Sequence, residues 1–395
     1  MTESKVIESK IETKLTSDGL TSETLRELAA TEGPCVTVIL PPYRPGEPGK
    51  PAAAVLKTDL QEAAKKLAAR RIAQPLIDEL LEPLHQLSHE EESLAGSGWA
   101  RSIFRSPGVC RQFELTVPPT PEQACSAGDC FWIRPVLRSL AVPEKIYVLQ
   151  VSKKSVALVS CAASEVARVE LPKGTPATLD EALGLDAPDH DLINRSSAGP
   201  STGSMAGVQF GTGYEREAQH AHLHDFYRMV DRGIHEVLRS RQAPLVLAGV
   251  DEDTAIYRSI NTYPNLVEPA IGGVPPAPAD LTRQARHIVL SSFERRAALR
   301  LQEARERLAP GRFSADLDAI LRAAAERRVI DLYLDENGYC RGNFEGKIFG
   351  GHGNWHDEDL LNVAAVETLL AGGAVYSLPS HAMPDGAMAA ASFRY

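Results

Sequence analysis

Pro244-Leu-Val-Leu-Ala-Gly249 is a short apolar run that ends in glycine and leads into the acidic sequence Val250-Asp-Glu-Asp253. A run of this kind is typical of a buried strand that leads into a helix. From Tyr214 onward, apolar residues recur in steps of three and four, which predicts a helix with one buried face. The residues of this face are Leu223, Phe226, Tyr227, Val230, Ile234, Val237 and Leu238. Gly233 costs this helix about 1 kcal/mol relative to alanine, so the helix needs a packing partner.

The segment before this helix consists mainly of small residues. It reads Ser196-Ser-Ala-Gly-Pro-Ser-Thr-Gly-Ser-Met-Ala-Gly-Val-Gln-Phe-Gly-Thr-Gly213 and contains five glycines and one proline. Little in it can pack against a core, so we expect an exposed, mobile loop. Loop, helix and strand would then form one unit.

Further strand patterns surround this unit. Three short strands with tight turns are expected at 146–151, 155–160 and 166–171, and another strand at 266–271. Three antiparallel strands followed by helix, strand, helix and strand is the order of an RNase H-like sheet. Nucleases of that fold hold two metal ions, with one carboxylate on the first strand, but the first strand here has none. The acids at 251–253 are better explained by the helix start.

The remaining sequence predicts an α/β protein with three domains. The Gly- and Pro-rich sequence at 272–279 predicts a stiff linker. Helices are expected at 281–308, 313–327 and 357–371, and strands at 329–334 and 374–378. The expected parts are a flexible lead-in at 1–20, an N-terminal α/β domain at 21–140, a middle RNase H-like domain at 141–272 and a C-terminal α/β domain at 280–395.

Composition narrows the class of protein. The chain of 395 residues is 43% hydrophobic and 24% charged, as in globular proteins. No apolar run approaches the roughly 20 residues of a membrane span, and no signal peptide is visible, so we expect a cytoplasmic protein. The net charge of −10 argues against indiscriminate coating of nucleic acid, yet residues 283–328 hold eleven arginines against six acids. The six cysteines are too few for a disulfide scaffold, and we expect neither a metal nor a cofactor.

Three features in this order carry a resemblance to a known family. Gly207-Val-Gln209, the long helix and Leu245-Val-Leu-Ala-Gly249 look like the middle domain of archaeo-eukaryotic class one release factors and of Pelota. Leu361-Asn-Val-Ala-Ala-Val-Glu-Thr-Leu-Leu-Ala-Gly-Gly-Ala-Val375 resembles their third domain, which implies a C-terminal α/β sandwich. Gly33-Pro-Cys-Val-Thr-Val-Ile-Leu-Pro-Pro42 resembles the bacterial members of the superfamily.

The resemblance implies a site in the loop. In release factors a Gly-Gly-Gln loop enters the ribosomal peptidyl-transferase centre, where the glutamine helps to place a water against the ester of peptidyl-tRNA. Gly207 and Gln209 would be the catalytic residues here. Val208 stands where the second glycine would be, and a β-branched residue resists positive φ and adds bulk, which argues against hydrolysis. Three alternatives stay open: an inert loop, a loop that contacts ribosomal RNA without chemistry, and a hydrolytic loop.

Arginines are the candidate RNA ligands, since a guanidinium binds phosphate through two hydrogen bonds. The alternative is a solvated helix face with Glu–Arg pairs, such as Glu303 with Arg307. The candidates are Arg216, Arg283, Arg286, Arg295, Arg296 and Arg300.

The resemblance implies a translation factor in rescue, hibernation or termination that binds the ribosome and ribosomal RNA at a tRNA-like site. The Asn-Ile-Lys-Ser signature of stop-codon readers does not occur in the sequence, so decoding is not expected. The alternative is a peptidyl-tRNA hydrolase that uses Gln209. DNA and membranes are not expected partners, and a delivering translational GTPase and the oligomeric state are left open.

Overall fold

The computed structural model describes residues 20–41, 52–89, 99–120, 124–162, 165–184, 212–345 and 354–395. It divides into two compact units, and the chain of the first is interrupted by the second. Unit 1 comprises residues 1–144 and 290–395, and unit 2 comprises residues 145–289. The predicted α/β class is confirmed. None of the helices in the described part of the chain has the length and apolarity that a membrane span needs.

Unit 2 is built on a five-stranded mixed sheet with the order β7-β6-β5-β8-β9. Its strands are β5 (Ile146–Val151), β6 (Val156–Cys161), β7 (Val166–Val169), β8 (Leu245–Gly249) and β9 (Leu266–Gly272). The first three strands are antiparallel, and β8 and β9 then run parallel to β5. This is the predicted RNase H-like topology. The helices of this unit are α6 (Leu179–Ala182), α7 (Thr212–Leu238), α8 (Asp251–Ile260) and the first part of α9 (Pro278–Arg307).

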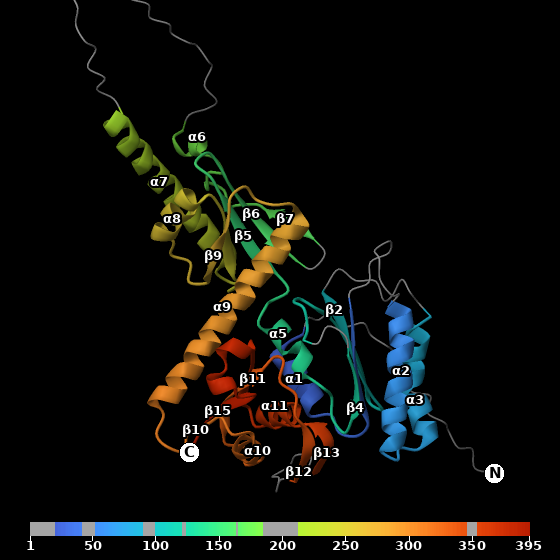
Figure 1. The fold of residues 1–395 in the computed structure, drawn as a ribbon. Helices are drawn as coiled ribbons and strands as arrows, with labels where there is room; N and C mark the ends of the chain where they lie inside the picture. The colour runs from blue at the N-terminus through green and yellow to red at the C-terminus, as the bar shows by residue number, and fades with distance from the viewer. Residues whose placement is uncertain are drawn as a thin grey trace, which may run out of the picture. The chain divides into compact units, whose positions relative to one another are not determined.

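Helix α7 packs on this sheet through the predicted apolar face, and its N-terminal end extends away from the strands (Figure 1). Most residues of that face are fully buried, and Val237 is partly buried. Because α7 has 27 residues, it is roughly 40 Å long.

The N-terminal segment of unit 1 forms the antiparallel sheet β3-β2-β1-β4. Its strands are β1 (Cys35–Leu40), β2 (Ala100–Ser106), β3 (Val109–Leu115) and β4 (Ala124–Gly128). Its helices are α1 (Ser22–Ala29), α2 (Ala52–Ala69), α3 (Gln74–Leu87), the 3-10 turn η1 (Arg134–Val136) and α5 (Leu137–Leu140). Helices α2 and α3 lie side by side on one face of this sheet, where their apolar residues form a core with β1 and β2 (Figure 1).

The C-terminal segment of unit 1 forms a second sheet with the order β10-β15-β11-β14. Its strands are β10 (Phe313–Ser314), β11 (Val329–Asp335), β14 (Ala374–Leu378) and β15 (Ala389–Phe393), and β12 (Arg341–Glu345) pairs separately with β13 (Asn354–Asp359). Its helices are α10 (Leu317–Ala325), α11 (Leu360–Leu370), the last part of α9 and the 3-10 turns η2 (Ser380–Ala382) and η3 (Pro384–Gly386).

The two segments of unit 1 share one hydrophobic core. Leu25 and Phe131 of the N-terminal segment lie in the same buried cluster as Leu321, Leu332 and Val366 of the C-terminal segment. Helix α1 packs directly against α11. Residues 21–140 and 290–395 are therefore joined by burial of apolar surface, which is the main favourable contribution to folding.

Two predicted helices begin later in the structure than the sequence predicts. The helix expected at 313–327 begins only at Leu317, because Phe313 and Ser314 pair with β15. The helix expected at 357–371 begins at Leu360, and residues 354–359 belong to the β12–β13 hairpin instead. In both places strand pairing outweighs the helical pattern of the sequence.

Candidate functional site

The predicted catalytic residues Gly207 and Gln209, together with Val208, lie outside the described residues. The structure does describe the element that follows them, because α7 begins at Thr212. Arg216 belongs to α7, but its side chain is also outside the described part. Of this candidate site, the structure therefore describes helix α7 and its packing on the sheet.

Gly233 allows α7 to approach the loop before α6. A Cβ atom at this position would lie closer to the side-chain atoms of Thr175 than van der Waals contact permits. The sequence predicts that this helix needs a packing partner, and at Gly233 the neighbouring side chain is that of Thr175. The close contact explains why the helix tolerates a residue of low helix propensity here.

A buried carboxylate ties α7 to the end of α8. Asp231 is 3% exposed, and its carboxylate accepts hydrogen bonds from the hydroxyl of Thr262 at 2.6 Å and from the phenol of Tyr257 at 3.3 Å. The backbone N–H of Thr262 adds a third donor at 3.2 Å. Burial raises the pKa of Tyr257, and the negative charge of Asp231 raises it further. The tyrosine thus stays a neutral donor, and the register of α7 against α8 is fixed.

The acids after β8 occupy the first turn of α8, where negative charge stabilises a helix. Asp253 is 2% exposed and accepts a hydrogen bond from the backbone N–H of Lys153 at 3.1 Å. Glu252 pairs with the ammonium group of Lys153 at 2.8 Å. Burial raises the pKa of Asp253, against the lowering effect of Lys153. In the described part of the chain, no three His, Cys, Asp or Glu side chains are grouped as metal ligands.

The five candidate arginines of α9 have different environments. Arg286 is 3% exposed, so its side chain is not at the surface where RNA would bind. Arg283 is exposed and pairs with Asp280. Arg295, Arg296 and Arg300 are exposed, and the guanidinium of Arg300 donates to the phenol of Tyr376 at 3.0 Å.

A basic groove lies along the exposed side of α7. Its volume is about 700 Å³, and it is lined by Arg232, His235, Arg239 and Thr262, with the acid Glu236 among them. Residues 232, 235 and 239 share one helix face, because they are three and four positions apart. This groove was not predicted from the sequence. The signal was the recurrence of basic residues opposite the apolar face of the same helix.

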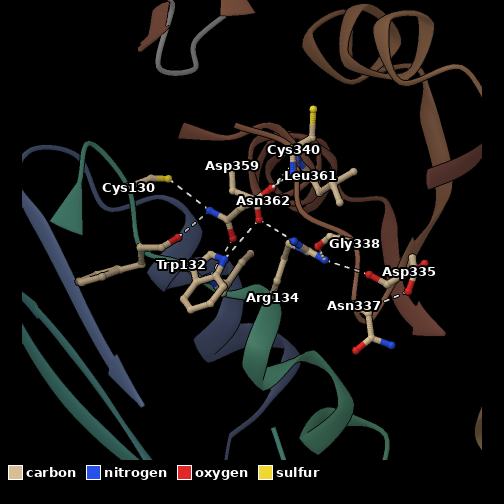
Figure 2. A network of polar contacts seen from close by, with 12 residues as sticks. Cys130, Trp132, Arg134, Asp335, Asn337, Gly338, Cys340, Asp359, Leu361 and Asn362 are labelled. Carbon is tan, nitrogen blue, oxygen red and sulfur yellow. Dashed lines mark hydrogen bonds and ion pairs between the residues drawn. The ribbon is translucent and has the colours of Figure 1, made fainter. Parts of the chain in front are cut away.

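A buried polar network joins the two segments of unit 1 (Figure 2). The guanidinium of Arg134 pairs with the carboxylate of Asp359 at 2.5 Å, and both side chains are less than one-tenth exposed. Arg134 also donates to the carbonyls of Asp335 at 2.9 Å and Gly338 at 2.7 Å. The indole N–H of Trp132 reaches Asp359 at 3.4 Å. Every partner of Arg134 lies about 200 residues further along the chain.

Asp359 also begins helix α11. Its second carboxylate oxygen accepts the backbone N–H of Leu361 at 3.2 Å and that of Cys340 at 3.3 Å. One turn further on, Asn362 accepts the N–H of Ile133 at 2.9 Å and donates to the carbonyl of Phe131 at 3.0 Å (Figure 2). Because these groups bond one another, their role is to hold the two segments together.

Sequence reasoning missed this network. Arg134 interrupts the apolar sequence Phe131-Trp-Ile-Arg-Pro-Val-Leu137, and Asp359 directly precedes the apolar helix α11. A single charge in an apolar run is a signal for a buried ion pair, since a buried charge needs a partner. The sequence gives no indication of which charge, more than 200 positions away, is that partner.

Part of the chain matches the model of a known protein family. Residues 146–328 match the family model described as bacterial archaeo-eukaryotic release factor family 3. The matched region contains every strand of the β7-β6-β5-β8-β9 sheet, together with helix α7 and the arginine-rich helix α9. No curated protein matches the chain.

Solved structures of translation factors overlap with the chain loosely. The crystal structure of the archaeal translation termination factor aRF1 is 12% identical, with a TM-score of 0.24, and the overlap covers 95% of this chain and 99% of that one. Pelota of Archaeoglobus fulgidus is 13% identical, with a TM-score of 0.34 and coverages of 75% and 79%. Dom34 of S. cerevisiae, described as a translation termination-like factor that interacts with Hbs1, is 10% identical, with a TM-score of 0.32 and the same coverages.

Proposed function

We propose that the chain is a translation factor that binds the ribosome at a tRNA-like site, because residues 146–328 match the model of bacterial archaeo-eukaryotic release factor family 3. The observation that supports this most is the arrangement of unit 2. The glycine-rich segment that we predict to be a loop precedes α7, a helix of roughly 40 Å whose described apolar contacts with the sheet lie between Leu223 and Leu238. Such a helix can present a loop far from the body of its unit.

The proposed orientation places this loop toward the peptidyl-transferase centre. Val208 argues against the backbone conformations that the Gly-Gly-Gln motif allows, so the protein binds there without cleaving the peptidyl-tRNA ester. The task is rescue, hibernation or a step related to termination, without decoding of a stop codon. Hydrolysis by Gln209 is the competing outcome.

Exposed arginines support contact with ribosomal RNA. Arg295 and Arg296 have no ion-pair partner among the described residues, so their guanidiniums are available for phosphate oxygens. The groove along α7 adds Arg232 and Arg239 within the family-matched region. Because the whole chain has a net charge of −10, RNA would bind only where these arginines are exposed, and the protein would bind it in a defined orientation.

Sedimentation with purified bacterial ribosomes tests the binding. The full chain should pellet with ribosomes at low salt and dissociate as salt rises, because phosphate contacts release counterions. The double variant Arg295→Ala/Arg296→Ala should bind about tenfold more weakly, with a shallower salt dependence. The matched control is Arg305→Ala/Arg307→Ala on the same helix, whose guanidiniums pair with Asp385 and Glu303. Failure of the unaltered chain to pellet at low salt would refute the proposal.

A release assay distinguishes binding from hydrolysis. Ribosomes that carry labelled peptidyl-tRNA should keep their peptide when the unaltered protein binds. Release that Gln209→Ala abolishes would show instead that the protein is a hydrolase. Val208→Gly gives this chain the Gly-Gly-Gln sequence of the release factors. If the loop can support hydrolysis, this variant should show more peptide release than the unaltered protein.

A further inference from the structure

A cleft of about 580 Å³ opens beside the polar network, within unit 1. One wall is formed by the C-terminal end of α2 and by β4, and the other by the residues around the start of β12, by the end of β13 and by the first turn of α11. Its volume is in the range of small-molecule sites, which is 300–1,000 Å³ as an order of magnitude. The polar network explains how the two segments are joined, but it does not explain why a cleft is present beside it.

The carboxylate of Glu358 forms the acceptor of the cleft. This residue is 8% exposed, and its Oε1 atom accepts the N–H of Asp129 at 3.0 Å and pairs with Arg70 at 2.9 Å. The close approach requires Gly128, because a Cβ atom there would collide with the carboxylate. Among the described residues both contacts end on Oε1, so Oε2 is the oxygen that can accept a hydrogen bond from a molecule in the cleft.

Cations and aromatic rings line the same cleft. The ammonium group of Lys66 donates to the carbonyl of Cys125 at 2.8 Å and keeps two further N–H donors. Arg341, on β12, is exposed. The rings of Trp132 and Tyr339 also line the cleft, and Tyr339 is 60% exposed. A large exposed aromatic side chain next to cations is typical of sites that bind nucleic-acid bases.

We propose that this cleft binds a nucleoside phosphate whose base carries an amino group, with the base against the aromatic side chains and Glu358, and the phosphate at Lys66 and Arg341. The ligand is either a free nucleotide or one residue of an unpaired RNA strand. Adenine, guanine and cytosine can donate an amino N–H to the carboxylate. Uracil is disfavoured, because its only N–H on that edge lies between two carbonyl oxygens that the carboxylate repels.

Two simpler occupants fit less well. A bare phosphate or an acidic peptide would meet Glu358 and Asp129, and like charges repel at short range. A divalent cation would lie next to Arg70, which pairs with both of these carboxylates at 2.9 and 3.0 Å. A ligand with donors at one end and negative charge at the other matches both the acids and the cations. This inference does not depend on the proposed function.

Calorimetric titration of the full chain with single nucleotides tests the site. AMP, GMP and CMP should bind about tenfold more tightly than UMP, which corresponds to one discriminating hydrogen bond. Ribose 5-phosphate should bind more weakly than any of the three. Equal binding of all probes, or no binding by any, would refute the proposal.

Two variants locate the binding, and neither requires the polar network to be broken. Lys66→Ala should weaken all the nucleotides about fivefold by loss of a phosphate contact. Lys65→Ala removes the neighbouring exposed lysine on α2, which does not line the cleft, and should leave affinity unchanged. In Glu358→Gln the amide oxygen can still accept the N–H of Asp129, while the amide NH2 group faces the ligand as a donor. A donor suits the carbonyl oxygens of uracil, so the preference should shift toward UMP. An equal loss with Lys65→Ala and Lys66→Ala would refute the assignment.

The source of the nucleotide is decided by a further pair of titrations. If an unpaired six-residue adenine RNA binds more tightly than AMP, and Lys66→Ala weakens both, the cleft serves an RNA strand. If AMP binds as tightly as the RNA, the cleft serves free nucleotides. Neither result depends on ribosome binding, so this site and the proposed function can fail separately.

Discussion

The buried polar contacts of Asp231 inside unit 2 join residues that are close in the sequence, whereas those of Arg134 inside unit 1 join residues that are far apart in the sequence. Unit 2 consists of one continuous stretch of chain, and the carboxylate of Asp231 in it bonds a residue only 31 positions away. Unit 1 consists of two stretches, and its buried ion pair joins Arg134 to Asp359 over 225 positions. Because unit 1 is formed by two stretches of chain with unit 2 between them, contacts between residues far apart in the sequence have to join these stretches. The comparison suggests that unit 1 depends on a few buried polar contacts to a degree that unit 2 does not.

Asp359→Ala should have the largest effect on stability. It removes the partner of a buried guanidinium and the carboxylate that begins α11, and it leaves Arg134 charged inside unit 1. We expect a loss of about 3–5 kcal/mol in the free energy of unfolding of unit 1. Urea denaturation with hydrogen exchange should show lost protection both in η1 and α5 and in α11, while α7 and β8 keep theirs.

The control for this variant is Glu303→Ala, which breaks the exposed pair of Glu303 with Arg307 and should cost less than about 0.5 kcal/mol. Loss of protection in residues 290–395 alone, with residues 21–144 unaffected, would mean that the two segments of unit 1 fold separately. The comparison would then fail, and the three expected domains would be favoured.

Gly233→Ala tests how unit 2 is packed. In an open helix this change would stabilise by about 1 kcal/mol. Here the added methyl group collides with Thr175, and overpacking of this kind costs about 1–3 kcal/mol. The net effect should therefore be a loss of up to about 2 kcal/mol that is confined to unit 2, measured by the same denaturation assay.

The double variant Gly233→Ala/Thr175→Ala provides the matched test. Removal of the hydroxyl and methyl groups of Thr175 relieves the two closest contacts of the new Cβ atom, so part of the loss should be recovered. If the double variant is no more stable than Gly233→Ala alone, the glycine is needed for a reason other than this contact.

The difference between the units also explains what the sequence could predict. In unit 2 the spacing of apolar residues predicted α7, the strands around it and the order of the mixed sheet, because these elements follow one another along the chain. In unit 1, residues 357–359 were predicted to begin a helix, although they belong to β13, which pairs with β12. Strand pairing depends on a partner that local sequence does not reveal.

The candidate sites were predictable to different degrees. The five arginines of α9 were found from local charge, but burial of Arg286 depends on tertiary packing that periodicity alone did not reveal. The cleft with Glu358 could not be found, because Lys66 and Glu358 belong to segments that only the folded chain brings together. Gly207 and Gln209 remain predictions, as their segment is outside the described residues.

Asp253→Asn should give the smallest effect, and one that depends on pH. Burial raises the pKa of this carboxyl above its usual value of 3.8. A raised pKa in the folded state means that folded unit 2 binds the proton more tightly than the unfolded chain does, so the stability that this proton contributes is lost as pH rises.

The asparagine does not titrate, so the stability of Asp253→Asn relative to the unaltered chain should increase as pH rises from about 3 to about 6. Denaturation midpoints of unit 2 at a series of pH values measure this difference. The control is Asp251→Asn, which removes an exposed carboxylate from the same turn of α8. A relative stability of Asp253→Asn that falls over this range would contradict the assignment. The carboxylate of Asp253 would then be stabilised by Lys153 more than burial destabilises it, and unit 2 would hold a buried charge as firmly as unit 1 does.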